Sequence, residues 1–290
     1  MRVAFMGTPA FAVPCLARLA ADGHAVLAAF AQPDKPQGRK MLLTPPPVKI
    51  AAEALRIPVL QPERVKNNAE VLNFLRGLAL DVILVVAYGK ILPQELLALP
   101  AYGCINVHAS LLPKYRGAAP IQWAILNGER ETGVTAMQMD AGIDTGDMLL
   151  QETLLIPEDM AAGELYAALS DLGAKLLSHT LALLEQGRLQ PKKQDHALSS
   201  HAPMLTKALS PMDWSRPARA LHNQVRGLYP WPGATMEYEA RKLKVIRSKV
   251  AEEPAGFCME CGDGNYLELV EVQSEGKKQM SGVEFLRGVR

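Results

Sequence analysis

The 290-residue chain is poor in cysteine and contains no long apolar run. Cysteine occurs at four positions only, Cys15, Cys104, Cys258 and Cys261. So few thiols predict a reducing compartment rather than a disulfide-stabilised secreted fold. No apolar run approaches the roughly 20 residues that span a bilayer, and the N-terminus lacks the pattern of a signal peptide. We therefore expect a cytoplasmic protein that does not associate with membranes.

Motifs for common nucleotides and metals are also missing. Gly7 follows the first expected strand, but the next residues are Thr8-Pro9-Ala10-Phe11, so neither G-x-G-x-x-G nor a Walker A sequence is present. NAD and ATP are therefore poor candidates for a ligand. The C-x-x-C at 258–261 has no second pair and no nearby histidine, which disfavours zinc or redox chemistry. No metal is expected.

The net charge of +1 is unevenly distributed along the chain. Residues 207–249 carry nine Lys/Arg against three acids, whereas residues 250–290 carry four bases and eight acids. A locally basic surface favours a polyanionic partner. A mixed, solvated surface without a partner fits the charge distribution equally well.

The first half of the chain alternates apolar segments with amphipathic helical patterns. Strands are expected at residues 3–6, 26–30, 59–60, 82–87 and 105–107, and helices near 11–21, 48–55, 65–78 and 95–99. Continuously apolar strands separated by helices predict a mostly parallel sheet covered on both faces. The fold class is then α/β, and its ligand crevice should lie beyond the carboxyl ends of the strands.

The second half predicts a change of architecture. We expect strands at 133–139 and 148–156, then a helix from 161 to about 186. A polar, proline-containing stretch comes next. After it we expect a short helix near 217–226 and strands at 234–238, 242–246 and 266–272. We therefore expect a catalytic domain over 1–189, a linker over 190–207 and a second domain over 208–290. Short alternating strands suit a small β-barrel, of which the oligonucleotide-binding (OB) type is one option. Lys242 and Lys244 should lie on its solvent face.

Polar side chains occur at the end of the apolar strand near residues 104–108. Asn106 and His108 are two residues apart, so their side chains should point to the same side of the strand. They lie where an α/β sheet places its ligand crevice. An amide and an imidazole supply an oxyanion donor and a proton carrier, which acyl transfer to an amine requires. The pair is a candidate acyl-transfer site, with a purely structural role as the alternative.

A carboxylate is expected as the third member, to orient the imidazole or to take part in proton movement. Asp140, Asp144 and Asp147 all lie on the following turn-rich loop, and physical reasoning does not choose among them. Asp140 and Asp144 flank the turn at Gly142, so either could point back to the crevice. Aspartates in such turns also cap their own backbone.

Ser110 raises a Ser-His-Asp hydrolase as an alternative, because it lies close to His108 in the chain. The nucleophile elbow G-x-S-x-G is absent, however, since Ser110 stands between Ala109 and Leu111. The apolar residues up to Pro113 could instead form one wall of a pocket for a flat heterocycle.

Residues 32–49 form a second unusual stretch. They include five prolines and four basic residues, Lys35, Arg39, Lys40 and Lys49, against a single acid, Asp34. The stretch is too long for a simple connector. Phosphate binding and an exposed, solvated loop are the two interpretations.

Taken together, these residues resemble the methionyl-tRNA formyltransferase family along most of the chain. The matching blocks are residues 5–9, 32–35, 86–89, 104–120, 140–147 and the Trp231-Pro232 stretch. The most specific block is 106–113 followed by Arg116-Gly117.

The resemblance implies an enzyme that moves a formyl group from 10-formyltetrahydrofolate to the α-amino group of methionine on initiator tRNA. It implies a Rossmann-like formyltransferase domain followed by a C-terminal barrel related to the OB fold, and we expect a monomer. Among the loop aspartates it selects Asp144, which joins Asn106 and His108 as the catalytic trio. The further expected contacts are Ser110, Leu111, Leu112, Pro113 and Tyr88 for folate, and Lys35, Arg39, Lys40, Lys242 and Lys244 for tRNA.

Related enzymes that share this trio formylate a ribonucleotide or amino sugars, or hydrolyse formyl-folate. A second domain argues against the ribonucleotide enzyme, and the basic loop favours tRNA over a sugar nucleotide. One departure from the family pattern concerns residues 255–261, where the second domain is shorter than the family's barrel. This departure concerns the barrel topology and not the catalytic site.

Overall fold

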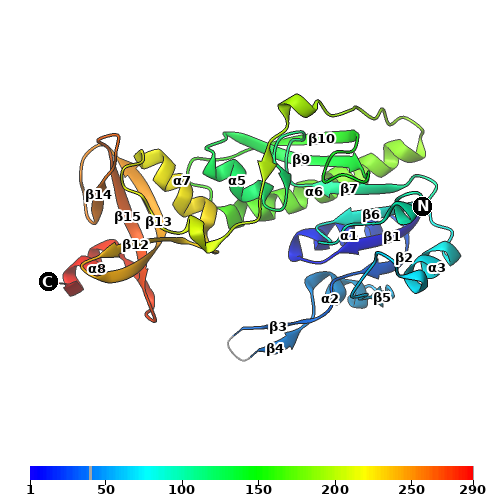
Figure 1. Ribbon diagram of the computed structural model, residues 1–290, viewed down its shortest axis with the longest axis horizontal. Coiled ribbons are helices and arrows are strands. Elements are labelled where there is room, and N and C mark those ends of the chain that lie inside the picture. The colour runs from blue at the N-terminus through cyan, green and yellow to red at the C-terminus, as the bar shows by residue number, and fades with distance from the viewer. Residues whose placement is uncertain (39–40, 290) are drawn as a thin grey trace. The chain divides into compact units, whose positions relative to one another are not determined.

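The computed structural model describes residues 1–38 and 41–289 (Figure 1). Its contacts divide the chain into two compact units. The first unit contains Met1–Arg116, Gly133–Thr153 and Ala167–His201, and the second contains Gly117–Thr132, Leu154–Tyr166 and Ala202–Arg290. Two segments that we expected in the first domain thus group with the C-terminal residues. The boundaries at 189 and 208 stay a prediction.

The first unit is built on a seven-stranded sheet. Its order is β10-β9-β7-β6-β1-β2-β5, formed by β1 (Arg2–Gly7), β2 (Ala25–Phe30), β5 (Val59–Leu60), β6 (Val82–Val86), β7 (Cys104–His108), β9 (Glu131–Gln138) and β10 (Met148–Leu155). The pairings from β7 through β6, β1 and β2 to β5 are parallel, and β7 pairs with β9 antiparallel. The expected mostly parallel, Rossmann-like sheet is confirmed.

Helices cover both faces of this sheet. They are α1 (Val13–Ala21), α2 (Pro47–Ala54), α3 (Ala69–Gly77), α4 (Gln94–Leu97) and α6 (Ala162–Glu185), with a 3-10 turn at Ala10–Ala12. On one face, Leu75 of α3 and Leu96 of α4 join the core around Ile83 and Val85 of β6. On the other face, Gly173 of α6 lies against Val107 of β7. The strands are therefore apolar on both sides, as the continuous hydrophobic runs predicted.

One predicted helix begins later than expected. The apolar pattern suggested a start near residue 65, but α3 begins at Ala69. Asn68 is the reason, because its side-chain oxygen accepts a hydrogen bond from the Val71 N–H at 3.1 Å and caps the helix.

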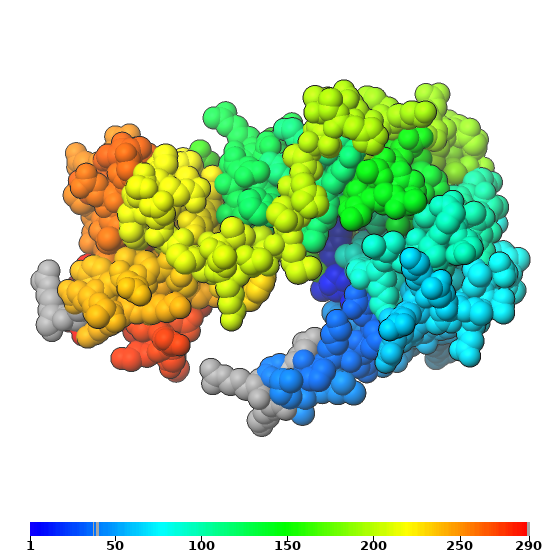
Figure 2. Space-filling model, in the orientation of Figure 1, coloured from blue at the N-terminus to red at the C-terminus, as the bar shows by residue number. Residues whose placement is uncertain are grey.

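The basic stretch contains a hairpin that the sequence did not predict. Strands β3 (Lys35–Gln37) and β4 (Leu42–Thr44) pair antiparallel. Asp34 anchors its base by accepting hydrogen bonds from Lys49 Nζ at 2.9 Å and Gln61 Nε2 at 2.7 Å. The hairpin extends away from the sheet of its own unit (Figure 1), and its blue atoms stand clear of that unit's surface (Figure 2).

The second unit is organised around an antiparallel sheet. Its strands are β12 (Ala234–Tyr238), β13 (Arg241–Ala251), β14 (Cys258–Glu260), β15 (Tyr266–Ser274) and β16 (Gln279–Ser281), in the order β12-β13-β15-β14 with β16 on β15. Its helices are α5 (Pro120–Leu126), α7 (Ala218–Leu228) and α8 (Gly282–Val289). A 3-10 turn at Lys207–Leu209 also belongs to this unit, whereas the turn at His196–Leu198 lies in the first unit. The short strands β8 (Arg116–Gly117) and β11 (His201–Ala202) fall at the boundaries between the two units.

The core of this unit lies between α7 and the sheet. Leu221 and Val225 of α7 pack with Leu243 and Val245 of β13, and Phe285 joins the same cluster. The domain of antiparallel strands that we expected is confirmed and is consistent with a small barrel. Strand β13 is longer than predicted, and the short stretch near 258–260 forms a three-residue strand, β14.

Gly133 of β9 lies where no side chain fits. A Cβ there would overlap the Glu152 carbonyl of β10 and come within 2.6 Å of Leu111 Cδ2. We expect Gly133→Ala to lower the free energy of unfolding by about 1–3 kcal/mol, because the neighbouring strand must move. The matched control is Gly77→Ala in α3, where nothing lies within 4 Å. Equal urea midpoints for the two variants would contradict the close approach of β9 and β10.

No helix among the described residues has both the length and the apolar character needed to cross a bilayer.

Candidate active site

Asn106 and His108 lie at the carboxyl end of β7. Asn106 is in register with Val85 of β6 and Met137 of β9, and His108 pairs with Thr135 of β9. Strand alternation puts both side chains on the face opposite to Val107, as predicted. The Asn106 side chain is half-buried, and within the described part of the chain no hydrogen bond to its amide is found. Its side-chain N–H groups are therefore not committed to another group among the described residues.

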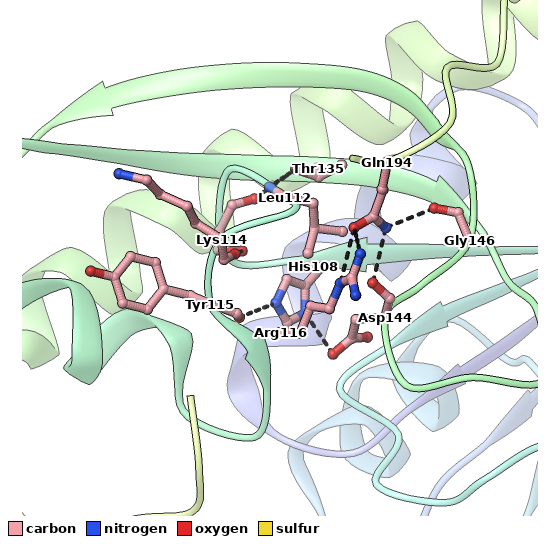
Figure 3. A network of polar contacts seen from close by, with 10 residues as sticks. His108, Leu112, Lys114, Tyr115, Arg116, Thr135, Asp144, Gly146 and Gln194 are labelled. Atoms are coloured by element: carbon pink, nitrogen blue, oxygen red, sulfur yellow. Dashed lines mark hydrogen bonds and ion pairs between the residues drawn. The ribbon is translucent and has the colours of Figure 1, made fainter. Parts of the chain in front are cut away.

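His108 is held at both ring nitrogens by main-chain and side-chain oxygens (Figure 3). The residue is 7% exposed, and Nε2 lies 2.9 Å from the Tyr115 carbonyl oxygen. Since a carbonyl oxygen only accepts, Nε2 carries the proton and donates. Nδ1 faces the Asp144 carboxylate at 3.7 Å. A neutral imidazole in this arrangement has a basic Nδ1 on the side of the carboxylate.

The three aspartates of the loop have different surroundings. Asp140 is exposed and caps its own turn, because Oδ1 accepts from the Gly142 N–H at 3.0 Å and from Thr145 Oγ1 at 2.7 Å. Asp144 adopts φ 53° and turns its carboxylate to His108. Asp147 contributes its main-chain oxygen to the Gln138 N–H. The geometry thus separates two aspartates that physical reasoning from the sequence had left equivalent. The catalytic role of Asp144 stays a prediction.

The residues of the predicted folate segment, Ser110 to Pro113, differ in how deeply they are buried. Ser110 is fully buried, and its hydroxyl donates to the Lys114 carbonyl at 2.6 Å rather than to His108, which disfavours the hydrolase alternative. Leu112 is also buried, and its N–H donates to Thr135 Oγ1 at 3.1 Å. Leu111 and Pro113 are half-buried. These last two keep accessible surface, and their contact with folate stays a prediction.

Tyr88, also expected at the folate site, has its side chain in the core between the sheet and helices α3 and α4. It is 1% exposed, and within the described residues its hydroxyl has no hydrogen-bond partner. Burial raises the pKa of the phenol to about 12, so it stays neutral and able to donate. Burial likewise raises the pKa of the Cys104 thiol, in the same cluster, to about 12.

The predicted tRNA contacts lie in different environments. Lys35 is exposed at the base of the hairpin, and its Nζ donates to Gln32 Oε1 at 3.0 Å. Arg39 and Lys40 lie outside the described residues. Lys242 is exposed on β13, as expected. Lys244 is less exposed, because its Nζ donates to the Pro230 carbonyl at 2.7 Å.

A pocket of about 260 Å³ opens at the carboxyl ends of β1 and β2. Its polar lining comes from Thr8, Gln32, Lys35 and Thr44, and four prolines with Ala10 form the rest. The pocket occupies the edge of the sheet at which β7 also ends, because β1, β2, β6 and β7 run parallel. Among the described residues, no group of three or more His, Cys, Asp or Glu is arranged to hold a metal ion.

Several residues around the trio were not predicted from the sequence. Tyr115 acts through its carbonyl oxygen, which every residue type has, so no sequence signal marks it. Gln194 donates to the main-chain oxygens of Asp144 and Gly146 at 2.9 and 2.7 Å. It lies in a polar stretch without periodicity, and only its burial distinguishes it from its neighbours.

Comparison with known proteins finds matches along both halves of the chain. A formyl transferase family model matches residues 1–181, and a model of the formyl transferase C-terminal domain matches residues 204–290. The chain is 51% identical to a methionyl-tRNA formyltransferase of Caldanaerobacter subterraneus subsp. tengcongensis, over 99% of this chain and 97% of that one. It is 50% identical to a methionyl-tRNA formyltransferase of Acidobacterium capsulatum, over 99% and 96%.

Solved structures show the same fold at lower identity. An N-formyltransferase from Helicobacter canadensis, in complex with folinic acid and dTDP-3-aminofucose, superposes with a TM-score of 0.69 at 20% identity, covering 91% of this chain and 97% of that one. This superposition shows the shared fold. The family models and the relatives at half identity establish that the chain belongs to the methionyl-tRNA formyltransferase family of formyl transferases.

Proposed function

We propose that this protein transfers the formyl group of 10-formyltetrahydrofolate to the α-amino group of methionine on initiator tRNA, as a cytoplasmic monomer. One observation carries the proposal: Asn106 and His108 end β7 on one face, and Asp144 turns its carboxylate to that histidine from the next loop. The full-length relatives at half identity bear the name of this activity.

Asn106 is the proposed oxyanion donor. Attack of the neutral amine on the formyl carbon turns the carbonyl oxygen into an oxyanion. The Asn106 amide has donors available and sits at the end of a strand, which keeps it in place as the charge develops. Fixed donors of this kind stabilise a transition state more than a ground state.

His108 is the proposed proton carrier. With Nε2 donating to Tyr115, the basic Nδ1 accepts a proton from the attacking nitrogen as the new C–N bond forms. The resulting imidazolium faces the Asp144 carboxylate, which stabilises its charge. The same proton then passes to N10 of the folate as the bond from N10 to the formyl carbon breaks. Atoms and charge balance without a metal.

The donor's heterocycle has a candidate location beside β6 and β7. Tyr88, Leu92 and Cys104 belong to one buried cluster on the face of Asn106, and the Tyr88 hydroxyl lacks a partner among the described residues. A buried hydroxyl without a partner is costly, and a polar ligand atom would relieve that cost. Exposed Ile91 and Ile143, 75% and 61% accessible, offer apolar surface on the neighbouring loops.

The acceptor is proposed to approach from the hairpin side. Leu42 and Leu43 are 65% and 67% exposed on the hairpin, and Lys35 lies at its base beside the pocket at β1 and β2. Apolar side chains beside basic ones suit a nucleic-acid end, where phosphates meet the charges and bases meet the apolar surface. Lys242 and Lys244 of the second unit would add contacts to the tRNA backbone. Residues 1–189 would then carry the chemistry and 208–290 the additional tRNA binding.

The acceptor can be identified by product analysis. The enzyme is offered formyl-folate with methionyl initiator tRNA, with a dTDP-amino sugar, or with neither. We expect formyl-methionine on the tRNA, with turnover of the amino sugar and hydrolysis lower by at least about 100-fold, since the acceptor contributes binding energy to the transition state. Preferential formylation of the sugar, or release of formate alone, would refute the proposed acceptor.

A further inference from the structure

The segment between the two family matches contains one buried polar residue in an exposed stretch. The matches end at residue 181 and resume at 204, so neither includes this segment. From residue 190 to 201, Gln194 is 6% exposed whereas every other residue is exposed. A glutamine is buried at such a place only if its amide is fully hydrogen-bonded.

The Gln194 amide uses all of its hydrogen-bonding positions (Figure 3). Nε2 donates to the Asp144 and Gly146 carbonyl oxygens at 2.9 and 2.7 Å. Oε1 accepts from Arg116 Nε and Nη2 at 3.1 and 2.7 Å. A reversed amide would place donors against the guanidinium and an acceptor against two carbonyls, so this orientation is fixed by the network.

Gln194 contacts the loop at residues 144–146, whose main-chain conformation is unfavourable by itself. Asp144 has φ 53°, in the left-handed region that residues other than glycine adopt at a cost. Gly146 lies so close to the Gln138 carbonyl that it leaves no space for a Cβ. Gln194 fixes the main chain of Asp144 on the side away from His108. Through this main-chain contact the Gln194 amide can influence the direction of the Asp144 carboxylate.

Ser200, in the same segment, contacts Tyr115, which is the second partner of the His108 ring. Ser200 Oγ accepts a hydrogen bond from the Tyr115 N–H at 2.9 Å, and the Ser200 carbonyl accepts from the Arg116 N–H at 2.9 Å. The Tyr115 carbonyl in turn accepts from His108 Nε2. Residues 194–200 thus hold Asp144 on one side of the imidazole and Tyr115 on the other.

We propose that Gln194 and Ser200 are positioning residues, which fix the imidazole and the carboxylate of the catalytic trio through main-chain contacts. Neither needs to touch the substrate. The kinetic part of this inference rests on the proposed function, whereas the structural part does not.

Gln194→Met tests the inference, because it keeps the side-chain length and removes all four hydrogen bonds. We expect kcat to fall about 10- to 100-fold, since misplacement of reacting groups by about 1 Å has such an effect. KM for the formyl donor should stay within about twofold, because no ligand contact is removed. The matched control is Gln190→Met, an exposed position four residues earlier. Unchanged kcat in Gln194→Met, or the same loss in both variants, would overturn the proposal.

A double-mutant cycle separates positioning from general destabilisation. If Gln194 acts through Asp144, Gln194→Met should cost less than about threefold in an Asp144→Asn background. Multiplicative losses would overturn the proposal. Ser200→Ala, at an exposed residue that poses little risk to folding, should lower kcat about three- to tenfold through Tyr115. No change in that variant would remove Ser200 from the assignment.

Hydrogen exchange of residues 140–147 in the full chain gives a readout that needs no acceptor. Exchange should accelerate in Gln194→Met and stay unchanged in Gln190→Met, because only the first change releases the loop. Failure of the wild-type enzyme to formylate the tRNA would refute the proposed function, and the exchange result would still decide the inference. Equal exchange in the wild type and Gln194→Met would refute it.

Discussion

Replacement of His108 by alanine is expected to lower the single-turnover rate of formyl transfer by about 100- to 10,000-fold. In the proposed mechanism the His108 imidazole, at the end of β7, accepts the proton from the amine and returns it to the folate nitrogen. Its Nε2 proton is committed to the Tyr115 carbonyl, so the proposal assigns the exchange to Nδ1. Alanine removes this atom and leaves the Asp144 carboxylate facing an apolar methyl group.

The control for this variant is His179→Ala on α6, where the side chain is exposed and the described contacts include no hydrogen bond to it. Its rate should equal that of the wild type. Donor binding to His108→Ala, measured by equilibrium titration, should change by less than about threefold, because the loss concerns the transition state. A normal transfer rate with weakened donor binding would show that His108 binds folate and does not move protons.

Asn106→Ala is expected to cost about 100- to 1,000-fold in the same rate, the effect of removing one oxyanion donor. Asn106→Asp should cost more. It has nearly the same shape, but it replaces a donor by a negative charge where the oxyanion forms. Asn73→Ala, at an exposed position on α3, is the matched control and should be neutral.

The order of the Asn106 variants tests the assigned role. If the side chain only packs against the neighbouring strands, the nearly isosteric aspartate should retain more activity than alanine. Single-turnover rates with donor-saturated enzyme distinguish the two cases. Higher activity of Asn106→Asp than of Asn106→Ala would contradict oxyanion stabilisation.

The sheet was predictable because its strands are apolar on both sides. Residues 82–86 are all buried in β6, and such a run leaves few alternatives to a central parallel strand. Asn106 and His108 were predictable as a pair because side chains two residues apart share one face of a strand. Those two rules depend only on local geometry, and they located the end of β7 that carries the candidate site.

The third member of the trio was not predictable from these rules. Asp140 and Asp144 flank the same turn, and their roles differ because of the φ of Asp144 and the hydrogen bonds that Asp140 makes within the loop. The Asp140 contacts are local, whereas the main chain of Asp144 is also bound by Gln194, 50 residues further along the chain. The resemblance to a family supplied the choice that local physics could not.

Other elements were missed for similar reasons. The hairpin β3–β4 has three-residue strands in a proline-rich stretch, so it carries no clear alternation. Helix α5 is seven residues long, and its apolar face resembles an extension of the preceding block. Tyr115 acts through its own main-chain carbonyl, and the Gln194 side chain donates to the main-chain carbonyls of Asp144 and Gly146, partners that no residue type signals. Long-range main-chain contacts are therefore the part of this site that only the structure reveals.

The central claim is that Asn106, His108 and Asp144 act as one unit on formyl transfer. The most direct test is the single-turnover rate of the triple alanine variant, with formyl-folate and methionyl initiator tRNA, compared with the three single variants. Groups that act as a unit should give a triple variant within about tenfold of the slowest single variant. Losses that multiply across the three positions, or a triple variant close to the wild-type rate, would contradict the assignment.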